Sequence, residues 1–226
     1  MDREEYVKRV AKAKKVPVEN VYQIIDICEK YGVEPIGNVF LRTPQDVDDI
    51  IKMCKERYID PDINRGYFRR TARDAKDIFD LCEKWKIIPE QMLFEYYADE
   101  LEETIKYIND NFGRKYLKPN IIVKGKEVLE KSMPCMAKIG LLPAAIRDAS
   151  VLALSDNEIL ERTAIVDYLG LRRAKICRDS KEVRLNGIYL LTQKKYQEFI
   201  EENGFSQKTL NAQVQNLIER DCAPEL

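Results

Sequence analysis

A short phrase recurs along this chain of 226 residues, and it constrains the fold more than any other feature. In the clearest copies a cysteine closes an apolar helical pattern, a turn follows, and a proline stands seven residues after the cysteine. The copies, the last two weaker, span 28–35, 54–61, 82–89, 136–143, 166–173 and 200–207. A degenerate copy at 109–113 divides the one long gap into two units of 27. Self-similarity at a fixed period in this range indicates stacked repeat units.

Each copy is typical of a helix end, a turn and the start of a second helix. Glycines such as Gly32 and Gly140 follow the apolar run and can take the left-handed conformation that ends many helices. The proline three residues later is suited to the first turn of a new helix. Upstream, a hydroxyl residue precedes an acid by three positions, which predicts an N-cap. These cap pairs are Thr43 with Asp46, Thr71 with Asp74, and Ser155 with Glu158.

The sequence therefore predicts an all-α protein: a right-handed helical-repeat solenoid of about six to seven stacked helix-pair units. We expect an N-terminal capping helix within 1–17, a repeat array over 18–206, and a C-terminal capping helix with a tail over 207–226. In the second helix-pair repeat, the shorter helix is predicted from Pro61 to Phe68. Near the C-terminal end, 172–184 is predicted to form a longer second helix.

Composition argues against catalysis and against a bound metal or cofactor. The chain has no histidine, no CxxC pair and no phosphate-cradling glycine loop. Three of its six cysteines, Cys28, Cys54 and Cys82, share one helical register, so we expect them to be small buried core residues. No apolar run approaches 18 residues and the N-terminus lacks the pattern of a secretory signal, so we predict a cytoplasmic protein without a membrane span.

Charge is segregated along the chain although the net charge is only −1. Acidic residues gather on the first helix of each unit, for example Asp74, Asp77 and Asp80. Basic residues gather on the second helix and the links, which predicts a basic face. The candidate phosphate-binding residues are Arg65, Arg69, Arg70, Arg73, Arg114, Lys115, Lys118, Lys124, Lys126, Arg172, Arg173, Lys175, Arg178 and Arg184. The alternative is that these are ordinary solvated faces, arranged to suit the helix dipoles.

The repeat unit resembles that of the mitochondrial transcription termination factor family. The resemblance lies in a helix opened by Thr43-Pro44, an apolar pattern, and phrases such as Ile139-Gly140-Leu141 and Leu169-Gly170-Leu171. It covers most of 18–206 and implies a curved all-α solenoid that holds duplex DNA or RNA on a basic concave surface. The resemblance gives backbone-phosphate roles to Arg65, Arg69, Arg70, Arg73, Lys124, Lys126, Arg172 and Arg173.

Two functions remain open from the sequence. The first is a nucleic-acid-binding helical-repeat protein that contacts the phosphate backbone, with a possible role in transcription or a related process. In that case Tyr67, Phe68 and Tyr116, which adjoin basic clusters, could stack on bases, although packing between repeats is the favoured role for each. The second is a protein-interaction scaffold with a groove for a partner helix or peptide.

Overall fold

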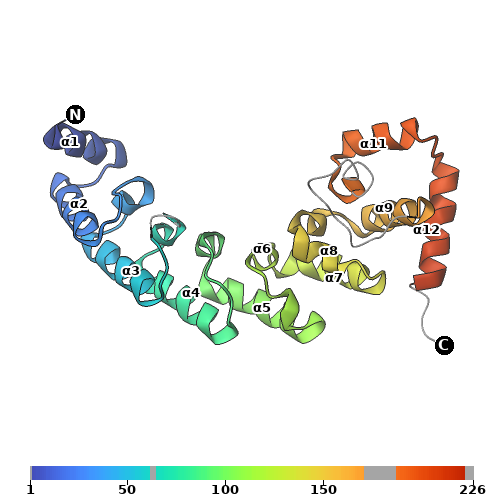
Figure 1. The fold of residues 1–226 in the computed structure, drawn as a ribbon, viewed down its shortest axis with the longest axis horizontal. Helices are drawn as coiled ribbons and strands as arrows, with labels where there is room; N and C mark the ends of the chain where they lie inside the picture. The colour runs from blue at the N-terminus through green and yellow to red at the C-terminus, as the bar shows by residue number, and fades with distance from the viewer. Residues whose placement is uncertain (1, 62–64, 171–186, 222–226) are drawn as a thin grey trace. The chain divides into compact units, whose positions relative to one another are not determined.

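The computed structural model describes residues 2–61, 65–170 and 187–221, and in these ranges the chain is helical, without strands. The chain forms two compact units (Figure 1). The first comprises residues 1–106 and 117–123, and the second comprises 107–116 and 124–226. The all-α prediction is therefore confirmed for the described residues.

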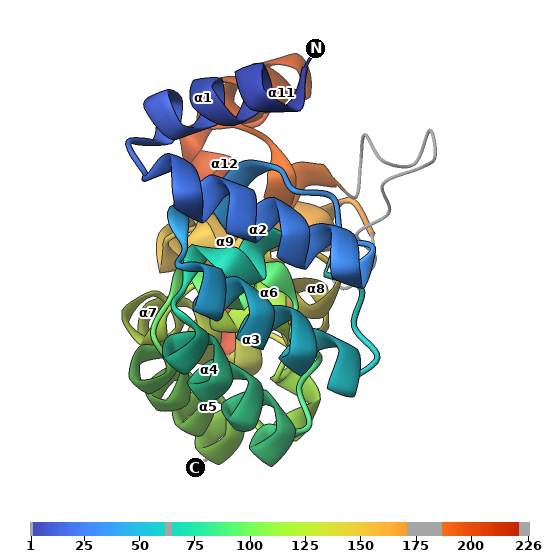
Figure 2. The same cartoon turned by 90° about the vertical axis from the view of Figure 1, so that its left-hand side faces the viewer.

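The first unit is built from two layers of helices. One layer holds the longer helices α1 (Arg3–Lys14), α2 (Val18–Tyr31), α3 (Pro44–Glu56), α4 (Ala72–Trp85) and the first part of α5 (Ala98–Phe112). The other holds the 3-10 helices η1 (Gly37–Leu41), η2 (Arg65–Arg69) and η3 (Gln91–Glu95), followed by α6 (Pro119–Ile122). From α1 to α4 each long helix packs on the next, as the run of α2, α3 and α4 in Figure 2 shows, and η1, η2, η3 and α6 pack in the same order in the other layer.

The predicted helix caps are present in the structure. The hydroxyls of Thr43, Thr71 and Ser155 accept hydrogen bonds from the backbone N–H three residues later, and Thr43 and Ser155 form full capping boxes. Gly32 ends α2 in the left-handed conformation, with φ of 70°. Short hydroxyl and acid side chains in these positions satisfy N–H groups that have no partner within the helix.

In the first unit the short elements η1, η2 and η3 are 3-10 helices, and their predicted starting point at a proline is wrong. Pro61 lies in a turn, and the short helix that follows it, η2, begins at Arg65. Pro35 and Pro89 also precede the helix, because each sits at the centre of a three-residue turn closed by Ile36 N–H to Glu34 O (2.9 Å) and Glu90 N–H to Ile88 O (2.8 Å). The φ that proline fixes suits this inverse γ-turn as well as it suits a helix start.

Elsewhere prolines do open helices: Pro44 opens α3 and Pro119 opens α6 in the first unit, and Pro143 lies at the start of α8 in the second. This unit contains α7 (Lys126–Lys138), α8 (Leu142–Arg147), η5 (Ala149–Ala153) and α9 (Asp156–Tyr168). It also contains η4 (Arg114–Tyr116), η6 (Gly187–Leu190), α11 (Gln193–Glu202) and the final helix α12 (Gln207–Asp221), which packs along α9. The predicted helix at 172–184 lies outside the described residues.

The 3-10 helices η1, η2 and η3 of the first unit each bury two consecutive side chains. In η2 these are Tyr67 and Phe68, each 1% exposed. Tyr67 packs edge-on against Phe94 of η3, with ring centroids 4.6 Å apart, and against Phe79 of α4 at 5.4 Å. Its hydroxyl donates to the carbonyl of Pro89, 2.8 Å away. One tyrosine therefore joins two 3-10 helices and a long helix, as expected for aromatic side chains with a polar tip.

Two charged side chains fasten α3 to α4. Asp46 accepts a hydrogen bond from the N–H of Ala72 (2.8 Å), which opens α4, and another from the Thr43 hydroxyl (2.7 Å). At the other end, Arg57 pairs with Glu83 (2.7 Å) and stacks over the ring of Phe79. Burial alone raises the pKa of Asp46, but these hydrogen bonds outweigh it and lower the pKa below the usual value.

Asp46→Asn is expected to lower the free energy of unfolding at pH 7 by about 1 kcal/mol, because a charged acceptor shared by two helix starts becomes neutral. Since the folded-state pKa is depressed, the carboxylate stabilises the fold above the unfolded pKa of about 3.9 and loses this effect as pH falls below it. Urea denaturation at several pH values from 7 to 2.5 should show that the free energies of unfolding of wild type and Asp46→Asn converge as the pH falls. Asp74→Asn, which affects a cap on one helix only, is the control; a gap between wild type and Asp46→Asn that is constant with pH contradicts the assignment.

Tyr58 and Lys86 stand four residues after Cys54 and Cys82, as Gly32 stands four residues after Cys28. Both adopt left-handed backbone angles, with φ of 55° and 50°. A Cβ is disfavoured there, and the Tyr58 side chain is 99% exposed, so little packing is lost on its removal. Tyr58→Gly and Lys86→Gly are each expected to raise the free energy of unfolding by about 0.5–1 kcal/mol, measured by urea denaturation. Glu103→Gly, in the middle of α5, should lower it by a similar amount. A loss of stability in the first two variants contradicts this prediction.

Candidate functional site

The structure shows that Arg69 and Arg70, two of the predicted phosphate-binding residues, are engaged within the first unit. Arg69 forms an ion pair with Glu95. Arg70 donates to the carbonyl oxygens of Phe94 and Glu95 at the end of η3, and its guanidinium lies 3.9 Å from the ring centre of Tyr97. These arginines therefore fasten η2 and the residue after it to the end of η3.

The remaining basic residues are distributed over both units. Arg73 and Lys118 belong to the first unit, are exposed, and make no ion pair with a described residue. In the second unit, Lys115 lies over the ring of Tyr116 and Lys126 forms an ion pair with Glu130 (3.8 Å). The other second-unit candidates are Arg114, which is exposed, and Lys124, which is half-buried. The side chain of Arg65, and all of Arg172, Arg173, Lys175, Arg178 and Arg184, lie outside the described residues.

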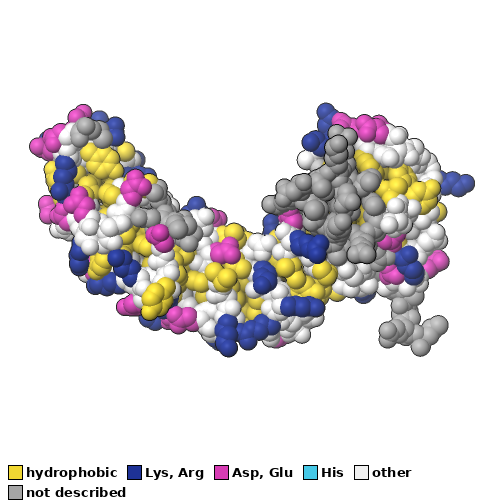
Figure 3. All heavy atoms as spheres, in the orientation of Figure 1, with side chains coloured by type: hydrophobic (Ala, Val, Ile, Leu, Met, Phe, Trp, Pro, Cys, Tyr) yellow, Lys and Arg dark blue, Asp and Glu magenta, His cyan; other side chains and the backbone are white. Residues whose placement is uncertain are grey.

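The aromatic residues considered for base stacking are buried instead. Tyr67 and Phe68 are 1% exposed and Tyr116 is 5% exposed. Their rings therefore fill the protein core and cannot present a face to a base. On the face drawn in Figure 3, acidic and basic side chains are interspersed over the first unit rather than separated.

A groove lies between α4 and α5 in the first unit. Its volume is about 450 Å³, within the range of roughly 300–1,000 Å³ that is common for binding sites. Its lining comprises Asp74, Asp77, Asp80, Leu81, Lys84, Tyr97, Ala98, Asp99 and Glu102. Five carboxylates and a single ammonium give this groove a strongly acidic lining.

Sequence reasoning missed this groove, although a signal was present. The acids of α4 recur at every third residue, from Asp74 through Asp77 to Asp80, so they follow one side of the helix. Their grouping on the first helix of each unit was recognised. That α5 presents Asp99 and Glu102 across a hollow from them depends on how the two helices pack, and periodicity does not give this.

The repeated cysteines are core residues, as predicted. Cys28 and Cys54 are fully buried and Cys82 is 3% exposed. Burial raises the pKa of the Cys54 and Cys82 thiols to about 12, so both are neutral in the folded protein at physiological pH. Within the described ranges, no group of histidine, cysteine, aspartate or glutamate side chains is arranged to hold a metal ion. Nor does any described helix combine the length and apolar character needed to cross a membrane.

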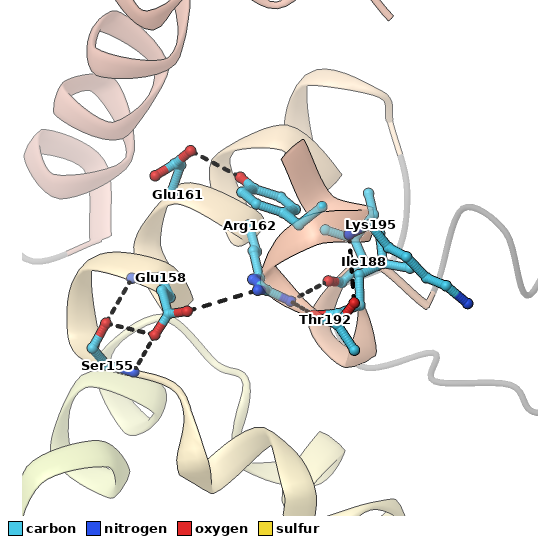
Figure 4. Close-up of polar contacts among 9 residues, drawn as sticks. Ser155, Glu158, Glu161, Arg162, Ile188, Thr192 and Lys195 are labelled. Atoms are coloured by element: carbon cyan, nitrogen blue, oxygen red, sulfur yellow. Dashed lines mark hydrogen bonds and ion pairs between the residues drawn. The ribbon is translucent and has the colours of Figure 1, made fainter. Parts of the chain in front are cut away.

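The second unit contains a buried arginine, which sequence reasoning also missed (Figure 4). Arg162 on α9 is 1% exposed and donates to the carbonyl oxygens of Ile188 (2.7 Å) and Leu191 (2.9 Å). It lies 3.8 Å from Glu158 and its guanidinium covers the ring of Tyr196, whose hydroxyl donates to Glu161 (3.0 Å). Burial lowers the pKa of Arg162. The donors aim at backbone oxygens of the same unit, so the cluster holds η6 and α11 against α9.

A register signal could have singled out Arg162. Ile50 and Ile78 each stand seven residues after a cap threonine and are fully buried, and Arg162 stands seven residues after the cap Ser155. An arginine at an isoleucine position of a repeat must find buried acceptors.

Comparison with known proteins found no match among family models, curated proteins or solved structures. The function must therefore be argued from the residues and their geometry.

Arg162→Met is expected to destabilise the second unit by about 2–4 kcal/mol, because two buried carbonyl oxygens lose their donor. Amide hydrogen exchange should accelerate in η6 and α11 while α2 and α3 keep their protection. Arg220→Met, which removes an exposed ion pair with Asp167, is the control and should cost less than about 1 kcal/mol. Unchanged exchange in η6 and α11 contradicts the role given to Arg162.

Proposed function

We propose that this chain is a helical-repeat protein of the right-handed solenoid type that acts as a scaffold for another protein. Support comes from the first unit, where a long helix and a 3-10 helix recur and each layer packs on the corresponding layer of its neighbours. Units that bury their apolar faces against one another leave helix surfaces along the stack available to partners.

The observation that carries the scaffold proposal is the groove between α4 and α5. It is open to solvent, has apolar residues in its lining, and carries exposed acidic groups such as Asp77, which forms no ion pair with a described residue. A surface of this sign repels phosphates and attracts basic groups. Two of the arginines expected to hold phosphate, Arg69 and Arg70, have their donors directed at the protein itself. Together these features favour a protein partner over a nucleic acid.

Nucleic-acid binding is the second candidate, and Arg73 and Lys118 favour it. Both are exposed and carry charges that no described acid neutralises by an ion pair. The resemblance of the repeat phrase to the mitochondrial transcription termination factor family points the same way. In this proposal the protein contacts the phosphate backbone of DNA or RNA without reading bases.

One pair of measurements separates the two functions. Fluorescence anisotropy with labelled duplex DNA, single-stranded DNA and RNA is expected to show no binding at low salt, the condition under which contacts to the phosphate backbone are strongest. Affinity purification with the full chain, after nuclease treatment, is expected to retain a protein partner in stoichiometric amount.

The opposite pattern establishes the second candidate. Nucleic-acid binding at low salt that is weakened in Arg73→Ala/Lys118→Ala, together with loss of the partner on nuclease treatment, overturns the scaffold proposal. The matched control is Lys8→Ala/Lys12→Ala on α1, which removes the same number of charges outside the predicted basic clusters.

A further inference from the structure

The geometry points to a specific partner for the groove between α4 and α5: we infer that it binds a basic peptide segment in which lysine or arginine residues flank an apolar side chain. This inference rests on the proposed scaffold function and names the chemistry of the partner. It is carried by the shape of the groove, by the arrangement of its carboxylates, and by which of them remain available.

Acidic side chains from both helices meet at the groove. Asp77 and Asp80 stand three residues apart on α4, and Asp99 and Glu102 stand three residues apart on α5. Positions three apart share one side of a helix, so each helix contributes a row of acids to the same hollow. Two rows on opposite walls suit a partner that carries several separated positive charges rather than one.

The carboxylates differ in their availability. Asp80 is already paired with Lys76, and Glu102 with Lys84 (2.6 Å), whose hydrogen bond lowers the pKa of Glu102. Asp77 and Asp99 are exposed and form no ion pair with a described residue. Asp99 accepts a hydrogen bond from the N–H of Glu100 (3.0 Å), and Asp74, which also has no ion pair, is half-buried and accepts from the Thr71 hydroxyl. Each wall therefore has one exposed carboxylate without an ion pair, Asp77 on α4 and Asp99 on α5, and these two are the expected contacts for basic side chains of the partner.

The apolar part of the lining provides a place for an uncharged side chain. Leu81 and Ala98 lie in it, and Tyr97 is 50% exposed, a large fraction for an aromatic residue. The guanidinium of Arg70 holds the Tyr97 ring in place from within the unit. In many peptide complexes the main chain of the peptide contributes affinity, and pockets that receive its side chains contribute specificity.

A metal ion and a nucleic acid fit this groove less well. The acids lie in rows on two helices and do not form a group that could hold a metal. Phosphate groups would face five carboxylates and one ammonium, which already bonds to Glu102. A basic peptide is therefore the occupant that the charge distribution favours.

The test uses the full-length chain and a peptide library of random sequence. Wild-type protein is expected to select peptides in which basic residues flank a leucine or an aromatic residue, and binding should weaken with added salt. Asp77→Lys/Asp99→Lys should reduce the affinity of the selected peptides by about tenfold or more, because two attractive contacts become repulsive. Glu103→Lys is the matched control: it lies on α5, is exposed, does not line the groove, and should leave affinity unchanged.

Circular dichroism of each variant checks that the helices remain folded. Selection of neutral or acidic peptides, or equal affinity of wild type and the double variant, overturns the inference. A protein partner that survives nuclease treatment and still binds Asp77→Lys/Asp99→Lys shows that the scaffold function stands while the groove is not its site. Salt-dependent binding of nucleic acid with no peptide selected overturns both.

Discussion

The structure of the first unit depends on the burial of two side chains by each 3-10 helix. A long helix followed by one turn of 3-10 helix cannot cover its own apolar face. The ring of Tyr67 is buried against Phe94 of η3 and Phe79 of α4, and η1 and α3 pack on the same 3-10 helix. The burial of these side chains therefore depends on contacts between successive helices rather than within one. The same dependence explains why polar fasteners such as Asp46 reach across to the next helix rather than stay within their own.

The all-α fold and the helix boundaries could be predicted from the sequence wherever the deciding interaction is local. Thr43 and Asp46 are three residues apart, so their pattern alone indicates a cap. Pro35 and Pro89 were misassigned because the φ of proline suits a γ-turn as well as a helix start, and the choice depends on the link that follows. A cap pair such as Thr43 and Asp46 thus locates the start of a long helix more reliably than a proline locates the start of a short one.

The sequence predicted much less of the candidate site than of the fold. The cluster of arginines near residue 70 was recognised, but the oxygen atoms that Arg70 contacts lie 24 and 25 residues further along the chain. The same holds for Arg162 and its carbonyl partners, 26 and 29 residues away. An arginine that binds phosphate and one that fastens two repeats look alike in the sequence, because both are predicted to lie at helix ends and links. Their difference lies in tertiary packing.

Gly66 connects the packing of the 3-10 layer to the geometry of the first unit. A Cβ placed there would stand 2.6 Å from the Cβ of Gln91, so η2 and η3 approach more closely than any other residue would permit. Tyr67, the next residue, packs on Phe94 of η3 with ring centroids 4.6 Å apart. A side chain at position 66 would therefore push apart both the two backbones and this pair of rings.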